Sequence, residues 1–264
     1  MTAQQASEIP ALELRSAHVR FGGVAAVNDV SLRIPAAPGI GAIIGPNGAG
    51  KTTVFNVLTG VIRPVSGQVM IAGRDMTGRR PDEIFRARVA RTFQGVRLFA
   101  HLNIRDNVLL AARSASAPGR PGGASVWIDR GGDAIRRAES ALAAVDLPYQ
   151  LWSALPDRLT LLERRLAEVA RALTVEPIVL LLDEPAAGLN TAEKERLCAL
   201  LSKLTISTGC RIVVIEHDMK LVMSIAEQIW VMNFGRLLGE GTPDQVRTNE
   251  AVVEAYLGTR SHHD

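Results

Sequence analysis

A glycine-rich stretch constrains the fold of this chain more than any other feature. It reads Gly45-Pro46-Asn47-Gly48-Ala49-Gly50-Lys51-Thr52-Thr53 and fits the pattern G-x-x-x-x-G-K-[ST]. An apolar, strand-like run at 40–44 precedes it, and a helix-like run at 53–58 follows it. Glycines let the backbone N–H groups of such a turn face a phosphate at the N-terminus of the helix. The stretch therefore predicts a strand, a phosphate-binding loop and a helix, as in an α/β nucleotide-binding fold.

Two side chains at the end of this stretch have expected roles. Lys51 should reach the β- and γ-phosphates of a nucleotide, and the Thr52 hydroxyl should bind Mg²⁺. The alternative is an ordinary glycine-rich turn between a strand and a helix. With glycine at about 7% of residues, a chain of this length should match the pattern by chance about one time in a hundred. The pattern and its flanks together favour nucleotide binding.

The composition narrows the class of protein. With 264 residues, the chain forms one large domain or a domain with a substantial subdomain. It has no apolar run near the ~18 residues that span a bilayer, and its start lacks the pattern of a signal peptide. Cys198 and Cys210 have no metal-binding or redox spacing, which suits a reducing cytoplasm. A net charge of +3 is too small to predict a nucleic-acid partner.

An apolar run at 178–182 ends in two carboxylates, Asp183 and Glu184. The run is typical of a central strand that is covered on both faces. Ligands of open α/β sheets bind at the carboxyl ends of such strands. The alternative is an acidic turn before Pro185. The phosphate-binding loop earlier in the chain favours catalysis, with Asp183 binding Mg²⁺ and Glu184 polarising the attacking water.

Two other polar residues follow predicted strands. His217 comes just after a strand at 211–215, and Gln94 comes just after one at 89–93. A histidine or an amide at the end of a strand is more often structural than catalytic. Because His217 is expected at the same sheet edge as the loop and the carboxylates, contact with a γ-phosphate is a reasonable hypothesis for it. Gln94 by itself indicates no role.

The first 35 residues predict two strands of an antiparallel sheet. Apolar and polar residues alternate at 12–15 and again at 29–34. Phe21 lies between the two runs. Its side chain is either core at the end of a strand or a flat surface on which an adenine stacks, and the spacing does not separate these alternatives.

Helical patterns fill the middle of the chain. A helix is expected at 104–112, a flexible loop at 114–123, and then two amphipathic helices. The second of them is rich in arginine and aligns Leu162, Leu166 and Leu173 on one face. This block interrupts an otherwise alternating β/α pattern, which predicts an inserted helical subdomain.

Taken in order, these features resemble an ATP-binding-cassette (ABC) ATPase over almost the whole chain. The matching set is Phe21, the loop at 45–53, Gln94, the arginine-rich helix, Asp183–Glu184 and His217. The resemblance implies an α/β P-loop NTPase core with an antiparallel β subdomain and an inserted α-helical subdomain, and ATP and Mg²⁺ as cofactors. It also implies that Phe21 stacks on adenine, that Gln94 touches Mg²⁺ and couples to a transmembrane partner, and that His217 contacts the γ-phosphate.

The expected organisation is one ABC ATPase domain over 1–264. Its nucleotide-binding core and β subdomain comprise 1–94 and 176–264, and its helical subdomain covers about 95–175. The segments at 91–99, 183–190 and 241–245 look like those of ATP-binding subunits of branched-chain amino acid importers. Relatives that carry urea or short amides share much of this pattern, so the resemblance does not select a substrate.

One segment departs from the pattern of the family. A gapless alignment places Leu159-Thr160-Leu161-Leu162-Glu163 at the signature, which is Leu-Ser-Gly-Gly-Gln and acts on the ATP of the opposite subunit. Thr160 offers a hydroxyl like that of serine. Leu162 replaces a glycine, and we expect its side chain to collide with the partner's γ-phosphate. Asn190 is a smaller departure, because many cassettes have aspartate at this place in the D-loop.

The resemblance implies a peripheral ATPase subunit on the cytoplasmic face of the cell membrane. Its partners would be a second ABC ATPase subunit, identical or different, two transmembrane permease subunits and, indirectly, an extracytoplasmic substrate-binding protein. One alternative is a non-transport ABC protein, although these usually carry a long coiled-coil insertion or a second cassette, and neither is visible in this sequence. Another is a weakly hydrolysing regulatory cassette, which Leu162 favours.

Overall fold

A six-stranded sheet forms the centre of the protein. The structure is a computed structural model that describes residues 9–116, 132–250 and 252. The strand order is β10-β9-β3-β8-β7-β6, in which all neighbours are parallel except the antiparallel pair β9 and β10. The strands are β3 (Gly39–Ile44), β6 (Val89–Arg91), β7 (Val179–Asp183), β8 (Arg211–Ile215), β9 (Gln228–Asn233) and β10 (Arg236–Gly241). Every residue of β3, β7 and β8 is buried, as expected for central strands of a parallel sheet.

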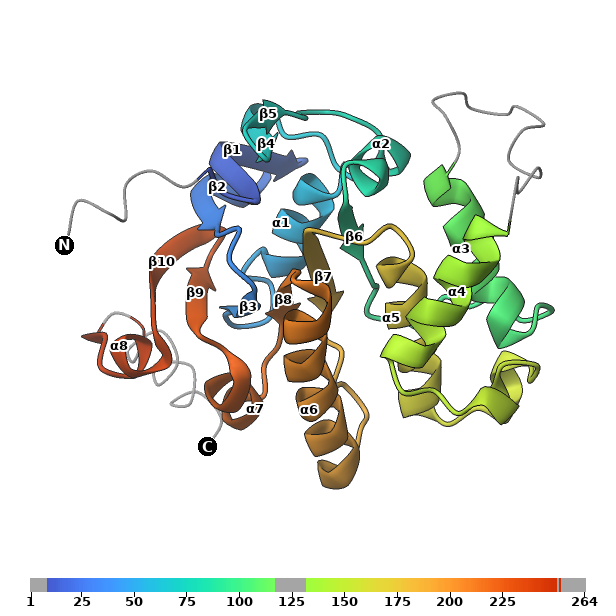
Figure 1. The fold of residues 1–264 in the computed structure, drawn as a ribbon. Helices are drawn as coiled ribbons and strands as arrows, with labels where there is room; N and C mark the ends of the chain where they lie inside the picture. The colour runs from blue at the N-terminus through green and yellow to red at the C-terminus, as the bar shows by residue number, and fades with distance from the viewer. Residues whose placement is uncertain (1–8, 117–131, 251, 253–264) are drawn as a thin grey trace.

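A second, antiparallel sheet covers one face of the first (Figure 1). Helix α1 (Lys51–Leu58) packs between the two sheets, where Phe55 and Leu58 share one core cluster with residues of both. Ile43 of β3 points into this cluster, whereas its neighbours Ala42 and Ile44 point to the other face. The strands of the second sheet are β1 (Leu12–Phe21), β2 (Val24–Ile34), β4 (Ser66–Ile71) and β5 (Arg74–Asp75).

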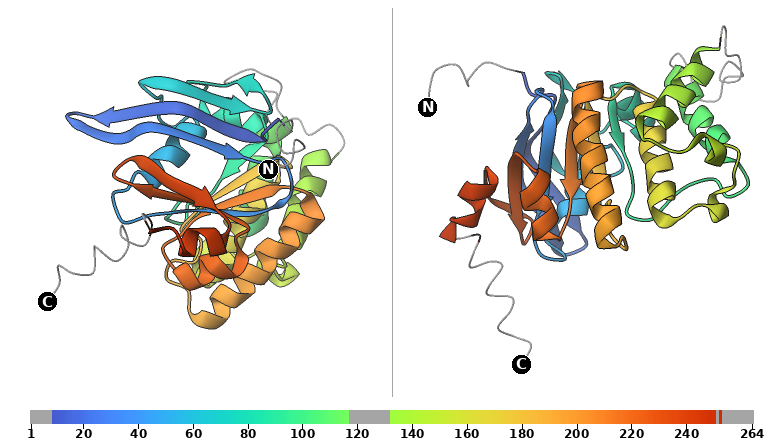
Figure 2. Two further views of the ribbon diagram at one scale, coloured as in Figure 1. Left: turned by 90° about the vertical axis from the view of Figure 1, so that its left-hand side faces the viewer. Right: turned by 60° about the horizontal axis from the view of Figure 1, so that its bottom comes forward.

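Helices cover the opposite face and one flank of the parallel sheet. In the second view of Figure 2, the antiparallel sheet and the block of α3, α4 and α5 lie at opposite ends of the protein. Short helix α2 precedes β6, and two single 3₁₀ turns at 149–151 and 156–158 connect α4 to α5. The helices are α2 (Pro81–Arg86), α3 (Ile104–Ser116), α4 (Asp133–Ala144), α5 (Leu161–Leu173), α6 (Thr191–Thr208), α7 (Met219–Ile225) and α8 (Pro243–Arg247).

The arrangement confirms the predicted α/β class with an antiparallel sheet and a helical block. Two predicted bounds were wrong. The strand expected at 89–93 ends at Arg91, and the loop expected at 114–123 starts later because α3 continues through Ser116. The rest of that loop lies outside the described residues. Within the described part of the chain, no helix is both long enough and apolar enough to cross a bilayer.

Candidate nucleotide-binding site

The predicted site residues emerge at one edge of the parallel sheet. Strands β3, β8, β7 and β6 are neighbours in the sheet and run in the same direction, so their carboxyl ends lie together. In the register, Ile43 lies opposite Ile215, which in turn lies opposite Asp183. The loop at 45–50, His217, Glu184 and Gln94 therefore all follow the ends of adjacent strands. This is the edge where ligands of open α/β sheets bind.

The loop at 45–50 requires glycine at two crowded positions. A Cβ atom on Gly45 would lie 2.2 Å from the Met232 carbonyl oxygen, and one on Gly50 would lie 2.4 Å from that of Ala26. Gly50 also has a φ of 96°, in the left-handed region that favours glycine. Helix α1 begins directly after it, with no side-chain cap and no acidic residue in its first turn. Its first N–H groups and the positive end of its dipole are thus available to an anion.

Lys51 lies back across this loop. Its Nζ atom donates hydrogen bonds to the carbonyl oxygens of Gly45 at 2.7 Å and Pro46 at 2.9 Å. Burial lowers the pKa of Lys51, and the nearby carboxylates of Glu184 and Asp183 oppose that effect. Thr52, the next residue of α1, is exposed. The lysine is therefore positioned by the loop itself, before any phosphate is bound.

Asp183 is held in one orientation with one oxygen free. The residue is 2% exposed. Its Oδ2 atom accepts a hydrogen bond of 2.7 Å from the Arg91 guanidinium, and its Oδ1 atom is buried without a hydrogen-bond partner. Burial raises the pKa of Asp183, and the hydrogen bond from Arg91 opposes this rise. A buried carboxylate oxygen without a partner fits a Mg²⁺ ligand, because Mg²⁺ prefers oxygen ligands of this kind.

Glu184 is in contact with Gln94. The Nε2 atom of Gln94 donates a hydrogen bond of 2.8 Å to the Glu184 carboxylate. Glu184 has a φ of 48°, which is uncommon for a residue with a side chain and often occurs at functional sites. Sequence reasoning places Gln94 at the metal, whereas in this structure its partner is the residue expected to polarise water. The structure thus brings the two residues together at the sheet edge.

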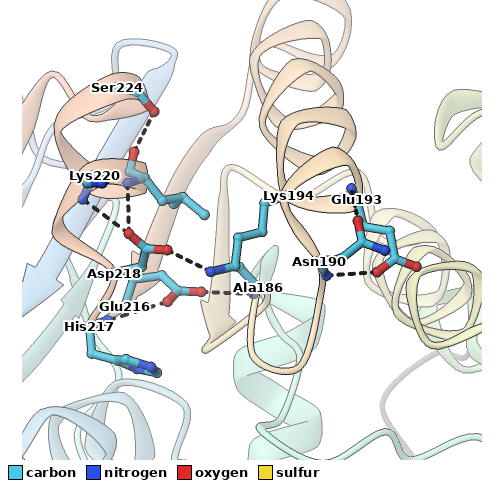
Figure 3. A network of polar contacts seen from close by, with 10 residues as sticks. Ala186, Asn190, Glu193, Lys194, Glu216, His217, Asp218, Lys220 and Ser224 are labelled. Carbon is cyan, nitrogen blue, oxygen red and sulfur yellow. Dashed lines mark hydrogen bonds and ion pairs between the residues drawn. The ribbon is translucent and has the colours of Figure 1, made fainter.

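His217 lies at the same edge and joins the polar network there through its backbone N–H (Figure 3). The residue is exposed, and its backbone N–H donates a hydrogen bond of 3.3 Å to Glu216. Glu216 is buried and also accepts a hydrogen bond of 2.8 Å from the Ala186 N–H, so it ties the end of β8 to the turn after β7. Burial raises the pKa of Glu216. The Glu216 carboxylate thus fixes the turns that carry His217 and Glu184.

Asn190 caps helix α6. Its Oδ1 atom accepts a hydrogen bond of 3.0 Å from the Glu193 N–H, and the Glu193 carboxylate accepts one of 3.0 Å from the Asn190 N–H (Figure 3). This reciprocal pair is a capping box. In the same network Lys194 pairs with Asp218, the cap of α7, at 2.7 Å.

Phe21 is the last residue of β1 and is 53% exposed. It pairs with Val24 at the tip of the β1–β2 hairpin. The same hairpin reaches the phosphate-binding loop, because the Ala26 carbonyl closely approaches Gly50. The exposed aromatic side chain thus lies on the hairpin that reaches the loop, and stacking on adenine stays a prediction.

The signature segment differs from the expectation in one respect. Thr160 caps helix α5, and Leu161 is the first helical residue. Leu162 is 3% exposed and packs in the core of the helical block with Leu166 and Leu173, as the helical periodicity predicts. Its side chain therefore does not project toward a partner's phosphate, contrary to what the alignment with the signature led us to expect. In the first turn of α5, the side chain at position 162 is the one that points into the core of the helical block. Leu159 is also buried.

Sequence reasoning missed two residues that support the site, Arg91 and Glu216. Arg91 donates to Asp183 across 92 positions of sequence, and Glu216 accepts from Ala186 across 30. The sequence contains a weak indication that both residues need a buried partner. Each is a charged residue at the carboxyl end of a buried strand, where its charge needs a partner.

Comparison with known proteins identifies the family. A sequence model described as ABC transporter matches residues 27–187, and one described as branched-chain amino acid ATP-binding cassette transporter matches residues 236–262. The chain belongs to the ABC transporter family of ATP-binding proteins. It is therefore a nucleotide-binding protein and an ATPase.

Individual relatives cover nearly the full length. The chain is 40% identical over 252 residues to the high-affinity branched-chain amino acid transport ATP-binding protein LivG of Salmonella typhimurium, covering 94% of this chain and 98% of the relative. Identity and coverage are the same for the protein BraF of Pseudomonas aeruginosa, which has the same description. A crystal structure of an ABC transporter cassette in its ADP conformation superposes with a TM-score of 0.81 at 27% identity, covering 94% of this chain and 98% of that one.

Proposed function

We propose that this chain is the ATP-hydrolysing subunit of an importer for branched-chain or related amino acids. The observation that carries the proposal is the meeting of the phosphate-binding loop, Asp183 and Glu184 at one edge of the sheet. The described relatives LivG and BraF, of nearly the same length, support the class of substrate. The importer would bind its substrate on other chains, and this chain would supply the energy of ATP.

The residues of the site divide the work of hydrolysis among them. Lys51 and the N–H groups of the loop at 45–53 hold the β- and γ-phosphates, and Phe21 stacks on the adenine. Asp183 Oδ1, the Thr52 hydroxyl and Gln94 would hold Mg²⁺, which would neutralise charge on the phosphate oxygens. Glu184 orients the attacking water, and His217 contacts the γ-phosphate.

We expect this chain to pair with a second ATP-binding cassette. Residues 159–163 at the start of α5 and Asn190 at the start of α6 would face the ATP of that partner, and the partner's signature would complete the site built on Lys51. The helical block at about 95–175 would then act as one unit against the core formed by 1–94 and 176–264. The chemistry of the signature segment at 159–163 governs whether two copies of this chain or two different cassettes form the pair.

A groove next to Gln94 provides the surface for a permease subunit. It has a volume of about 620 Å³, and its lining includes Phe93, Arg97, Phe99, Glu168 and Arg171. The Arg97 guanidinium lies 4.2 Å from the Phe93 ring centre, and the Arg171 guanidinium lies 5.5 Å from that of Phe99. Burial raises the pKa of Glu168, whose carboxylate accepts a hydrogen bond from the Arg97 N–H. An apolar permease loop with an acidic residue would complement these aromatic and basic side chains.

Two permease subunits with such loops would hold the two cassettes as peripheral proteins on the cytoplasmic face of the membrane. An extracytoplasmic binding protein would deliver the substrate and signal through the permeases. No nucleic acid has a part in this scheme.

The experiment is a transport assay in a host that lacks the gene for this chain. Uptake of radiolabelled leucine should be lost, restored by the native chain and left unrestored by Glu184→Gln. Urea and a short amide serve as parallel substrates. Loss of urea or amide uptake with normal leucine uptake would overturn the substrate class and leave the ATPase assignment intact.

A further inference from the structure

Arg91 is the most enclosed cation at the sheet edge that the proposed hydrolysis does not use. Its side chain is 5% exposed. The guanidinium donates hydrogen bonds to Asp183 Oδ2 at 2.7 Å and to Asn56 Oδ1 at 2.6 Å. It also lies 5.6 Å from the ring centre of Phe55 and 4.9 Å from that of Phe93. Side chains from α1, β7 and the segment after β6 therefore fix it from several sides.

A buried ion pair of this kind is weak support for a role in stability. Removing two charges from water costs about as much as their attraction returns, and apolar residues often replace such pairs without loss. The pair between Arg91 and Asp183 has a more specific consequence for the carboxylate. It occupies Oδ2 and leaves Oδ1 buried without a partner, so the carboxylate presents one defined oxygen.

Arg91 also connects this carboxylate to the groove. It lines the groove together with Phe93 and Arg97. Phe93 is in contact with both guanidinium groups, that of Arg91 at 4.9 Å and that of Arg97 at 4.2 Å from its ring centre. A shift of Phe93 would therefore displace Arg91 and, through it, Asp183.

We propose that Arg91 is a positioning residue for the metal ligand Asp183, and that Phe93 ties its position to the groove. The inference rests on the proposed function, in which Asp183 binds Mg²⁺. Arg91 does not touch the nucleotide or the metal. It orients the carboxylate from the side opposite the cation, as outer partners of metal ligands do, and such partners strongly affect the affinity for the metal.

The test measures metal affinity rather than activity. Mn²⁺ binding to the full chain with ADP is measured by electron paramagnetic resonance, and ADP affinity is measured separately in EDTA. In Arg91→Lys, which keeps the charge but loses the two-pronged geometry, Mn²⁺ affinity should fall by about 10- to 100-fold. ADP affinity without metal should stay near that of the native chain. Arg211→Lys is the matched control, because Arg211 is an equally buried arginine that pairs with Glu227 at the opposite end of the sheet, where β8 begins.

A second variant keeps the proposal testable if Arg91→Lys does not fold. Phe93→Leu preserves the ion pair and removes the aromatic support, and it should lower Mn²⁺ affinity by less than Arg91→Lys does. A folded Arg91→Lys protein with native Mn²⁺ affinity would overturn the inference, as would native affinity in Phe93→Leu where only that variant folds. Failure of the native chain to bind Mn²⁺ with ADP would instead refute the metal site of the proposed function.

Discussion

The N-termini of helices α1 and α5 carry the same backbone dipole, but only that of α1 is free to bind an anion. Helix α1 follows Gly50, has no side-chain cap and has no acid in its first turn. Helix α5 is capped by Thr160 and has Glu163 in its first turn. The first helix leaves its N–H donors and its partial positive charge unpaired, whereas the second helix satisfies both from its own side chains.

Hydrogen bonds between Thr160 and Glu163 occupy the polar groups at the start of α5. The Glu163 carboxylate accepts hydrogen bonds from the Thr160 N–H at 2.8 Å and from the Thr160 hydroxyl at 2.9 Å. The Thr160 oxygen in turn accepts one from the Glu163 N–H at 3.3 Å. A phosphate that approached this helix would meet a carboxylate and a hydroxyl already in use. The comparison indicates that the negative charge of Glu163 and the hydrogen bonds already made by Thr160, rather than the size of the Leu162 side chain, weaken the ability of this signature to bind a phosphate.

The largest expected effect tests α1 as the anion-binding helix. Lys51→Ala removes the ammonium that the loop carbonyls hold in place, and it should weaken ATP binding by about 2–5 kcal/mol, as when one partner of a buried hydrogen-bonded charge pair is truncated. Isothermal calorimetry with Mg-ATP measures it. Lys203→Ala is the matched control, because Lys203 pairs with Asp146 on the surface. Unchanged ATP affinity in Lys51→Ala would contradict the central assignment.

The next effect separates binding from hydrolysis at the α1 edge. Glu184→Gln keeps the shape of the side chain and its bond from Gln94 but removes the charge that orients water. Turnover should fall by roughly 10²-fold or more, with Mg-ATP affinity unchanged. Steady-state ATPase rates of the assembled transporter provide the measurement, with Glu193→Gln as control. Native turnover in Glu184→Gln would mean that another group activates the water.

Local patterns in the sequence were enough for much of the site. The loop at 45–53 and the strand before Asp183 depend on residues close together in the chain. The partner of Asp183 lies 92 positions away, and no local pattern could indicate which cation would meet that carboxylate. The helical periodicity correctly places Leu162 on the apolar face of α5 with Leu166 and Leu173, whereas the alignment with the family signature placed its side chain toward a partner's phosphate. The packing of α5 against the rest of the block decides the direction of this side chain, and the alignment alone contains no information on that packing.

A smaller effect tests the corrected position of Leu162. Because this side chain is buried in the core of the helical block, Leu162→Ala should lower the free energy of unfolding by about 2–3 kcal/mol, at the lower end of the range for buried leucines. Leu161→Ala should cost less, since Leu161 is only partly buried. Urea denaturation of both variants measures the difference. Equal losses would indicate that Leu162 is not a core residue and would return its side chain to the surface facing the partner.

The smallest expected effect addresses the charge at α5 directly. Glu163→Gln preserves the capping box, because glutamine can accept the Thr160 N–H as glutamate does. It removes a negative charge from the position where the partner's γ-phosphate would lie. A single charge at a helix terminus contributes about 0.3–1 kcal/mol, so ATP turnover of the isolated chain, paired with itself, should rise about 2- to 5-fold.

Helix α2 offers a matched control for this substitution. The Glu83 carboxylate accepts a hydrogen bond of 3.0 Å from the Arg80 N–H there, as the Glu163 carboxylate does from the Thr160 N–H at α5, but α2 lies beside β6 and away from the signature. Glu83→Gln should leave turnover unchanged. If Glu163→Gln raises turnover and Glu83→Gln does not, the negative charge of Glu163 weakens the native signature. A transporter with this chain should then pair it with a different cassette whose signature completes the site on Lys51. If the isolated chain already has a high rate that neither variant changes, the Glu163 carboxylate moves away from the phosphate when the dimer forms. Two copies of this chain would then be sufficient.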